Sequence, residues 1–157
     1  MNGVLLTAAL LAVPGAGGAV LLLMPNYRWA ARLNVVLAGA TFACALGLLA
    51  VRPDAGGLLI VDDLNNVFLI VSSLVGFTTS VFSAGYIGHE LETGRLTPAN
   101  LRFYHALYQA MIGAMNVALI ANNIGLLWVG VEVATLSTVM MVGIYRIHEA
   151  LEAAWKY

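Results

Sequence analysis

The amino-acid sequence predicts an all-α membrane protein with five transmembrane helices. Hydrophobic residues make up 61% of the 157 residues and charged residues only 10%, whereas soluble domains are usually about 45–50% apolar and about 25% charged. Five apolar stretches each have roughly the 20 residues that a helix needs to cross a hydrocarbon core of about 30 Å. They are residues 4–24, 33–51, 65–87, 103–121 and 124–145.

The first two stretches contain little besides apolar residues. No Lys or Arg precedes residues 4–24, so a spanning helix that contains Pro14 is favoured over a cleaved signal peptide. The second stretch holds Cys44, which is expected to be a packing residue because a lone cysteine forms neither a disulfide framework nor a metal cluster.

The third stretch, residues 65–87, carries small and hydroxyl residues at helical spacing, such as Ser72, Gly76, Thr79 and Ser83. In a membrane such residues are expected on faces that pack against other helices. Just before it, the apolar residues 58–61 are too few to cross a bilayer, and they predict a short strand or hairpin on the outer surface.

The fourth stretch places His105, Gln109 and Asn116 on one helical stripe, which is expected to face protein or water. His105 lies near the end of its span, so an interfacial role is favoured over a role in proton relay, which stays a weaker candidate.

The fifth stretch contains the strongest candidate site. Glu132 lies near the middle of residues 124–145 and is the only charged residue in that range. A charge at this depth costs about 2.5–3.5 kcal/mol on insertion scales, so the carboxyl must either stay protonated or have a cation or water beside it. A group that alternates between these states is a proton-transfer site, whereas a permanently neutral glutamate bonded to a neighbouring helix is the structural alternative.

The connecting segments predict the orientation. Six of the seven Lys and Arg residues fall between the first and second stretches, between the third and fourth, or after the fifth. Positive residues are retained in the cytoplasm, so the N-terminus is expected outside and the C-terminus inside. Residues 148–157 are predicted to begin a sixth helix, which is typical of a fragment, a split gene or part of a subunit.

Several function classes are disfavoured by composition. Seven Lys and Arg residues spread along the chain do not form the basic face that nucleic acids require. The sequence has no cysteine-rich cluster, glycine-rich nucleotide loop or paired histidines at metal spacing. No catalytic residue, metal or other cofactor is therefore expected in this chain, and its surroundings are the lipid bilayer and other membrane proteins.

The segments 101–108, 122–132 and 149–157 resemble the antiporter-like proton-pumping subunits. These subunits are shared by respiratory complex I (NADH:quinone oxidoreductase), multi-subunit cation/proton antiporters and membrane-bound hydrogenases. The sequence is most similar to hydrogenase-4 component F, which is associated with group 4 nickel-iron hydrogenases and formate hydrogenlyase. The resemblance runs from about residue 61 to the end, whereas the first two stretches match only in pattern.

This resemblance implies a membrane subunit of a multi-subunit complex in the cytoplasmic (inner) membrane, coupled to a peripheral redox arm. Glu132 would correspond to the family's glutamate in the fifth transmembrane helix, which is paired with a lysine two helices later. Lys156 is expected to be an interface anchor more than a relay residue. Only the N-terminal portion of the family's fold is represented, without that lysine or the second inverted half, so the 157 residues alone are not expected to pump.

Two other functions stay open. The chain could be a structural membrane piece that docks neighbouring subunits without its own translocation, or an antiporter-like subunit of an inorganic-carbon uptake complex.

Overall fold

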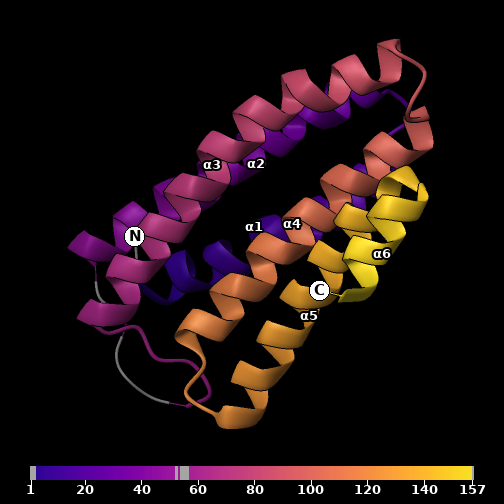
Figure 1. Ribbon diagram of the computed structural model, residues 1–157. Helices are drawn as coiled ribbons and strands as arrows, with labels where there is room; N and C mark the ends of the chain where they lie inside the picture. The colour runs from indigo at the N-terminus through magenta and orange to yellow at the C-terminus, as the bar shows by residue number, and fades with distance from the viewer. Residues whose placement is uncertain (1–2, 52, 54–56, 157) are drawn as a thin grey trace.

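The structure is a computed structural model, and it describes residues 3–51, 53 and 57–156. In this part of the chain there are six α-helices (Figure 1). They are α1 (Gly3–Leu23), α2 (Tyr27–Ala50), α3 (Asp63–Glu92), α4 (Pro98–Ile120), α5 (Ile124–Val142) and α6 (His148–Lys156), with a 3₁₀ turn, η1 (Gly143–Tyr145), between the last two. The predicted sixth helix is thus present.

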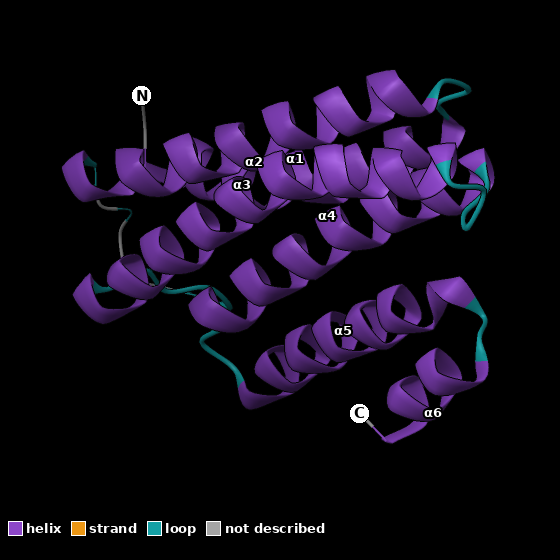
Figure 2. Cartoon of the chain, turned by 45° about the horizontal axis from the view of Figure 1, so that its top comes forward, coloured by secondary structure: helices purple, strands orange, loops and turns teal. Residues whose placement is uncertain are grey.

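Helix α4 is the centre of the bundle, because it packs against α1, α2, α3 and α5. Helices α2 and α3 lie against each other on one side of α4, and α5 lies on the other side, as Figure 2 shows. Helix α6 packs against α5 and η1, so the chain turns back on itself after Tyr145.

The helix starts are fixed by capping side chains. Asn26, Asp62, Thr97 and Asn123 each accept a hydrogen bond from a backbone N–H in the first turn of the helix that follows. These bonds satisfy donors that have no partner within the helix. The sequence therefore specifies the beginnings of α2, α3, α4 and α5 locally.

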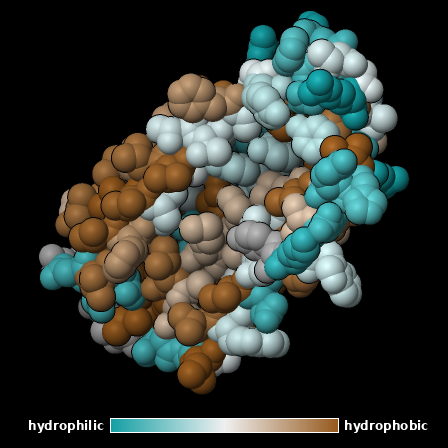
Figure 3. Space-filling view, in the orientation of Figure 1, coloured by the Kyte–Doolittle hydropathy of each residue, from teal (hydrophilic) through white to brown (hydrophobic). Residues whose placement is uncertain are grey.

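Four helices are long and apolar enough to cross a membrane: α1, α2, α3 and the segment Ile124–Tyr145 that contains α5. The exposed side chains of α3 include Val71, Val75 and Phe82, and the space-filling view shows apolar surface over much of the visible face (Figure 3). Apolar patches of this extent are typical of contact with lipid or with other membrane helices. The chain is therefore a multi-pass, all-α membrane protein.

Helix α4, the fourth predicted span, falls outside this group although it is 23 residues long. His105, Gln109 and Asn116 lower its mean hydropathy, and all three are buried by the neighbouring helices. A helix surrounded by protein does not need a fully apolar surface, since its polar groups face other helices instead of lipid.

The predicted strand or hairpin near residues 58–61 is wrong. In the described residues Leu59 forms an isolated antiparallel bridge with Ala121. The Ile60 N–H donates to the Ile120 carbonyl at 2.8 Å, and the Asn122 N–H donates to the Leu58 carbonyl at 2.8 Å. The segment pairs with the α4–α5 connection, where Leu59 packs against the apolar core.

Residues 89–95 are mostly polar, but they are not simply a solvated connector. Helix α3 continues to Glu92, and Glu90 is only 4% exposed. One oxygen of its carboxylate lies 3.5 Å from the Arg95 guanidinium, and the Arg95 N–H donates to the Glu90 carbonyl. Although this segment is polar in sequence, it contains the buried end of α3.

The small and hydroxyl residues of α3 pack against other helices as expected, except that Thr79 does not belong to the buried face. Gly76 and Ser83 are buried, but Thr79 is exposed. Ser73 and Ser80 complete the buried face. The Tyr108 hydroxyl donates to the Gly76 carbonyl at 2.6 Å, which ties α4 to α3.

Candidate ion-translocation site

The orientation of α5 is set by a close approach to α4 at Gly130. A β-carbon at this position would lie 2.8 Å from the Ala118 nitrogen and 2.9 Å from the Ala114 carbonyl oxygen. Only a glycine lets the two backbones come this near. Gly130 and Ser137 are the residues of α5 that are buried, so they mark the face that packs on α4.

Glu132 lies on the opposite side of α5. Two residues along an α-helix correspond to a rotation of about 200°, so the Glu132 side chain points away from the Gly130 contact. The side chain is exposed in this chain. No hydrogen bond or ion pair joins the Glu132 carboxyl to any of the described residues.

The side chains around Glu132 on this outer face are apolar or amphipathic. Trp128 is 62% exposed and Leu136 is 57% exposed. The Thr135 hydroxyl donates to the Val131 carbonyl of its own helix at 2.9 Å and is therefore occupied. The carboxyl thus stands alone on an otherwise apolar surface.

Glu132 also lies within one helical turn of the centre of the 22-residue apolar segment Ile124–Tyr145. Its carboxyl is therefore far from both ends of that segment. A carboxylate that faced lipid at such a depth would cost about 2.5–3.5 kcal/mol on insertion scales. The outer face of α5 consequently needs a protein partner, internal water or a bound proton beside Glu132, and the described helices supply no partner.

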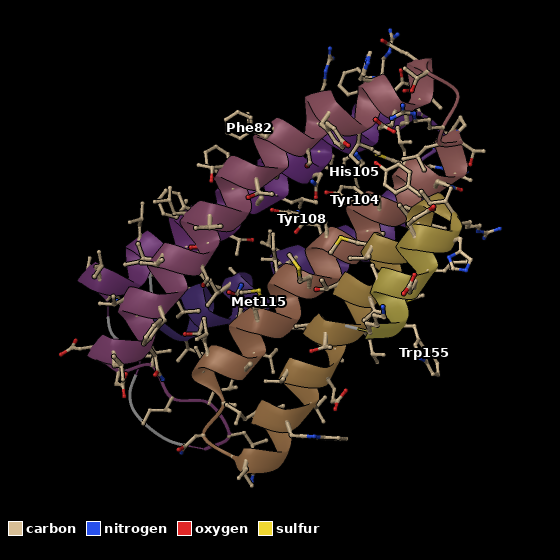
Figure 4. The ribbon with its side chains drawn as sticks, in the orientation of Figure 1. Phe82, Tyr104, His105, Tyr108, Met115 and Trp155 are labelled. Atoms are coloured by element: carbon tan, nitrogen blue, oxygen red, sulfur yellow. The ribbon has the colours of Figure 1, made fainter. Side chains whose placement is uncertain are left out.

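His105 occupies a different environment in the interior of the bundle. Its side chain is 1% exposed, so the imidazole does not reach the surface of this chain. The Tyr104 ring meets it edge to face, with ring centroids 5.4 Å apart, and Tyr108 follows one turn later on α4 (Figure 4). Neither ring nitrogen has a hydrogen-bond partner among the described residues.

A buried amide pair lies next to His105 along α4. The Gln109 amide donates to the Asn34 side-chain oxygen at 2.8 Å and to the Asn34 carbonyl at 3.0 Å. Further along α4, the Asn116 amide donates to the Leu10 carbonyl of α1 at 3.2 Å. The predicted polar stripe of α4 is therefore confirmed as a buried, interhelical one.

Asn34 was missed by the sequence reasoning. It lies near the start of an apolar run, and a single amide residue within an apolar stretch is the same feature that marked Gln109 as a buried polar residue. Glu90 was missed as well, because its neighbours in the sequence are polar.

Lys156 lies at the end of α6, where it forms an ion pair with Glu152 on the same helix. Among the described residues no hydrogen bond or ion pair links Lys156, His105 and Glu132. The structure thus does not assemble the three candidate residues into one cluster.

The fold and its apolar surfaces define the class of this protein as a multi-pass, all-α membrane protein. Over 150 residues the chain is 49% identical to the hydrogenase-4 component F homolog of Methylacidiphilum infernorum (isolate V4), and the alignment covers 96% of the chain. This finding confirms the resemblance to hydrogenase-4 component F. No family model matches the sequence.

The aligned region corresponds to 32% of the length of that relative. The chain thus spans about a third of the curated protein it matches.

Proposed function

We propose that the chain is part of an antiporter-like subunit of a hydrogenase-type membrane complex, in which Glu132 takes up and releases a proton during ion translocation. In this proposal five helices cross the cytoplasmic membrane, including α4, with the N-terminus outside. Other membrane subunits and a peripheral redox arm complete the complex, and electron transfer in that arm drives ion movement.

One observation carries this proposal: the isolated carboxyl of Glu132 near the centre of an apolar span. Because Gly130 holds the other face of α5 against α4, Glu132 cannot turn into the interior of this bundle without breaking that contact. An acid in this position is expected to be functional, since intramembrane ionisable residues are costly and mark ion pathways. The similarity to a hydrogenase-4 component F homolog supports the same function.

His105 is the second candidate on the pathway. Its buried imidazole and the neighbouring amide pair of Gln109 and Asn34 have polar atoms without partners, including both imidazole nitrogens and the Gln109 oxygen. Buried polar groups of this kind are usually hydrated. His105 is a weaker candidate than Glu132, because it lies nearer the start of its helix whereas Glu132 lies near the centre of an apolar span. Lys156, paired with Glu152, is the weakest candidate.

A structural role is the competing function, and the exposed outer face of α5 favours it. That face could simply bind a neighbouring subunit, with Glu132 as one permanent hydrogen-bonding group. An inorganic-carbon uptake complex would use a subunit of the same kind, and the neighbouring subunits would tell the two complexes apart.

The test is a Glu132→Gln substitution in the intact complex, assayed in inverted membrane vesicles. We expect acidification of the vesicle interior to fall by at least tenfold while hydrogen turnover falls much less, because the amide has nearly the same shape but does not exchange a proton. Glu149→Gln, at an exposed position of α6, is the matched control and should change neither rate. Undiminished acidification by the Glu132→Gln complex would reject the proposal and favour the structural role.

A further inference from the structure

An apolar groove runs between α1, α4 and α5. Its volume is about 500 Å³, and small residues line much of it, among them Gly15 and Gly18 of α1 and Ala110 and Ala114 of α4. The groove follows α4 from Phe103 to Val117, a distance of about 21 Å at the rise of an α-helix. This length exceeds half of a hydrocarbon core of about 30 Å.

A second pocket, of about 370 Å³ and with both polar and apolar lining, adjoins this groove at the end where α1 ends and α4 begins. Leu22 and Phe103 line both cavities, so the groove and the pocket lie next to each other. The pocket is also lined by Arg102, near the start of α4, and by Arg146, which follows α5 and η1.

Both arginines are unpaired with acidic residues in the part of the chain that the structure describes. One Arg102 Nη donates to the Met24 carbonyl at 3.0 Å, which anchors the guanidinium at the end of α1. The buried Arg102 Nε has no partner. Arg146 is exposed, and its backbone adopts a left-handed conformation with φ of 54°, where it ends η1.

The geometry points to a binding site for an anionic glycerophospholipid. Its phosphate would accept hydrogen bonds from Arg102 and Arg146, and one acyl chain would lie in the groove along Gly15, Gly18 and Ala110. The charge favours this occupant over a hydrophobic protein helix, because a helix would leave two guanidinium groups without an anion. Basic pockets beside membrane helices are suited to anionic head groups, and guanidinium groups bind phosphate through two hydrogen bonds.

The groove can be blocked without disturbing the packing of the helices. A β-carbon at Gly15 would meet no atom within 4 Å, and Gly15 lines the groove, so the side chain of a Gly15→Leu variant would extend into the groove. Gly85 on α3 is equally open and does not line the groove, which makes Gly85→Leu the matched control. For the pocket, the control is Arg32→Gln, because Arg32 stacks on Trp29 and does not line the cavity.

The experiment titrates the purified, detergent-solubilised intact complex with fluorescent phosphatidylglycerol and, separately, with fluorescent phosphatidylcholine. We expect saturable binding with a preference for phosphatidylglycerol. Each of Arg102→Gln and Arg146→Gln should lower that affinity about fivefold, given the usual contribution of one basic residue to anionic-lipid binding. Gly15→Leu should abolish the binding of both lipids, and Gly85→Leu and Arg32→Gln should change neither.

Three results would overturn the lipid site. The first is that the unmodified complex binds neither lipid in a saturable way, as expected if another protein segment fills the groove. The other two are equal affinity for the two lipids and undiminished binding after Gly15→Leu. Hydrogen turnover and vesicle acidification are separate measurements, so this site can fail while the role of Glu132 stands.

Discussion

At the scale of single residues, Gly130 determines where Glu132 points. The two residues lie on opposite sides of α5, and the backbone of α4 fits against the glycine without room for a side chain. A larger residue at 130 would either separate α5 from α4 or rotate it. The environment of the candidate acid therefore depends on a neighbour that carries no chemistry of its own.

Gly130→Ala tests this dependence. Because the new β-carbon would approach the α4 backbone to 2.8–2.9 Å, we expect a loss of stability of about 1–3 kcal/mol, as for other overpacked sites. The measurement is the midpoint of thermal unfolding in detergent. Gly85→Ala, which meets no neighbour, should unfold at the same temperature as the unmodified protein or slightly higher. Equal midpoints for the two variants would contradict the close contact.

At the scale of elements, α4 combines a central position with a polar buried face. It lies at the centre of the bundle, and its buried face carries His105, Gln109 and Asn116. The bonds from Gln109 to Asn34 and from Asn116 to Leu10 connect α4 to α2 and α1. These polar contacts fix the rotation of α4 more specifically than apolar packing alone does.

A double-mutant cycle on Asn34 and Gln109 measures one of these contacts. Gln109→Leu should destabilise the protein because it removes two bonds and leaves the Asn34 side chain buried without its donor. Asn34→Leu should destabilise the Gln109→Leu variant less than it destabilises the unmodified protein. Membrane hydrogen bonds of this kind have coupling energies of about 0.6–1.7 kcal/mol. Strictly additive effects on the unfolding midpoint would show that the amide pair does not stabilise the bundle.

At the scale of the whole molecule, the helices alternate in direction, and most basic residues gather at one end. Arg28, Arg95, Arg102 and Arg146 lie in or beside the connections at the end where α4 begins. Asn122 lies in the connection at the other end of α4. If α4 crosses the membrane, Thr93 and Asn122 must be on opposite sides of it.

Cysteine labelling tests this topology. In a Cys44→Ala background, a membrane-impermeant maleimide added to intact cells should label Asn122→Cys and leave Thr93→Cys unlabelled until the membrane is opened. Both native side chains are exposed, so access is not limited by packing. Reversed labelling would contradict the orientation predicted from the arginines, and labelling from the same side would show that α4 does not cross.

Much of this architecture was predictable from the sequence because it depends on local properties. Apolar length located the membrane helices, and the stripe of His105, Gln109 and Asn116 correctly indicated a buried face of α4. The amphipathic start of α6 was equally visible. These features follow from the composition and periodicity of single segments.

The remaining features depend on partners distant in the sequence. Leu59 bridges to Ala121 in the α4–α5 connection, so this pairing cannot be predicted from the residues on either side of Leu59. The partner of Gln109 is 75 residues away. The depth of Glu132 was apparent from its position in the span, but its outward direction follows from the packing of Gly130 on another helix.

The central claim is that the Glu132 carboxyl gains and loses a proton while the complex works. Infrared difference spectra between the resting and the turning-over complex measure this directly through the stretching band of a protonated carboxyl group. We predict that such a band changes during turnover, that Glu132→Gln removes it, and that the control Glu149→Gln retains it. An unaltered difference spectrum in the Glu132→Gln complex would contradict the claim.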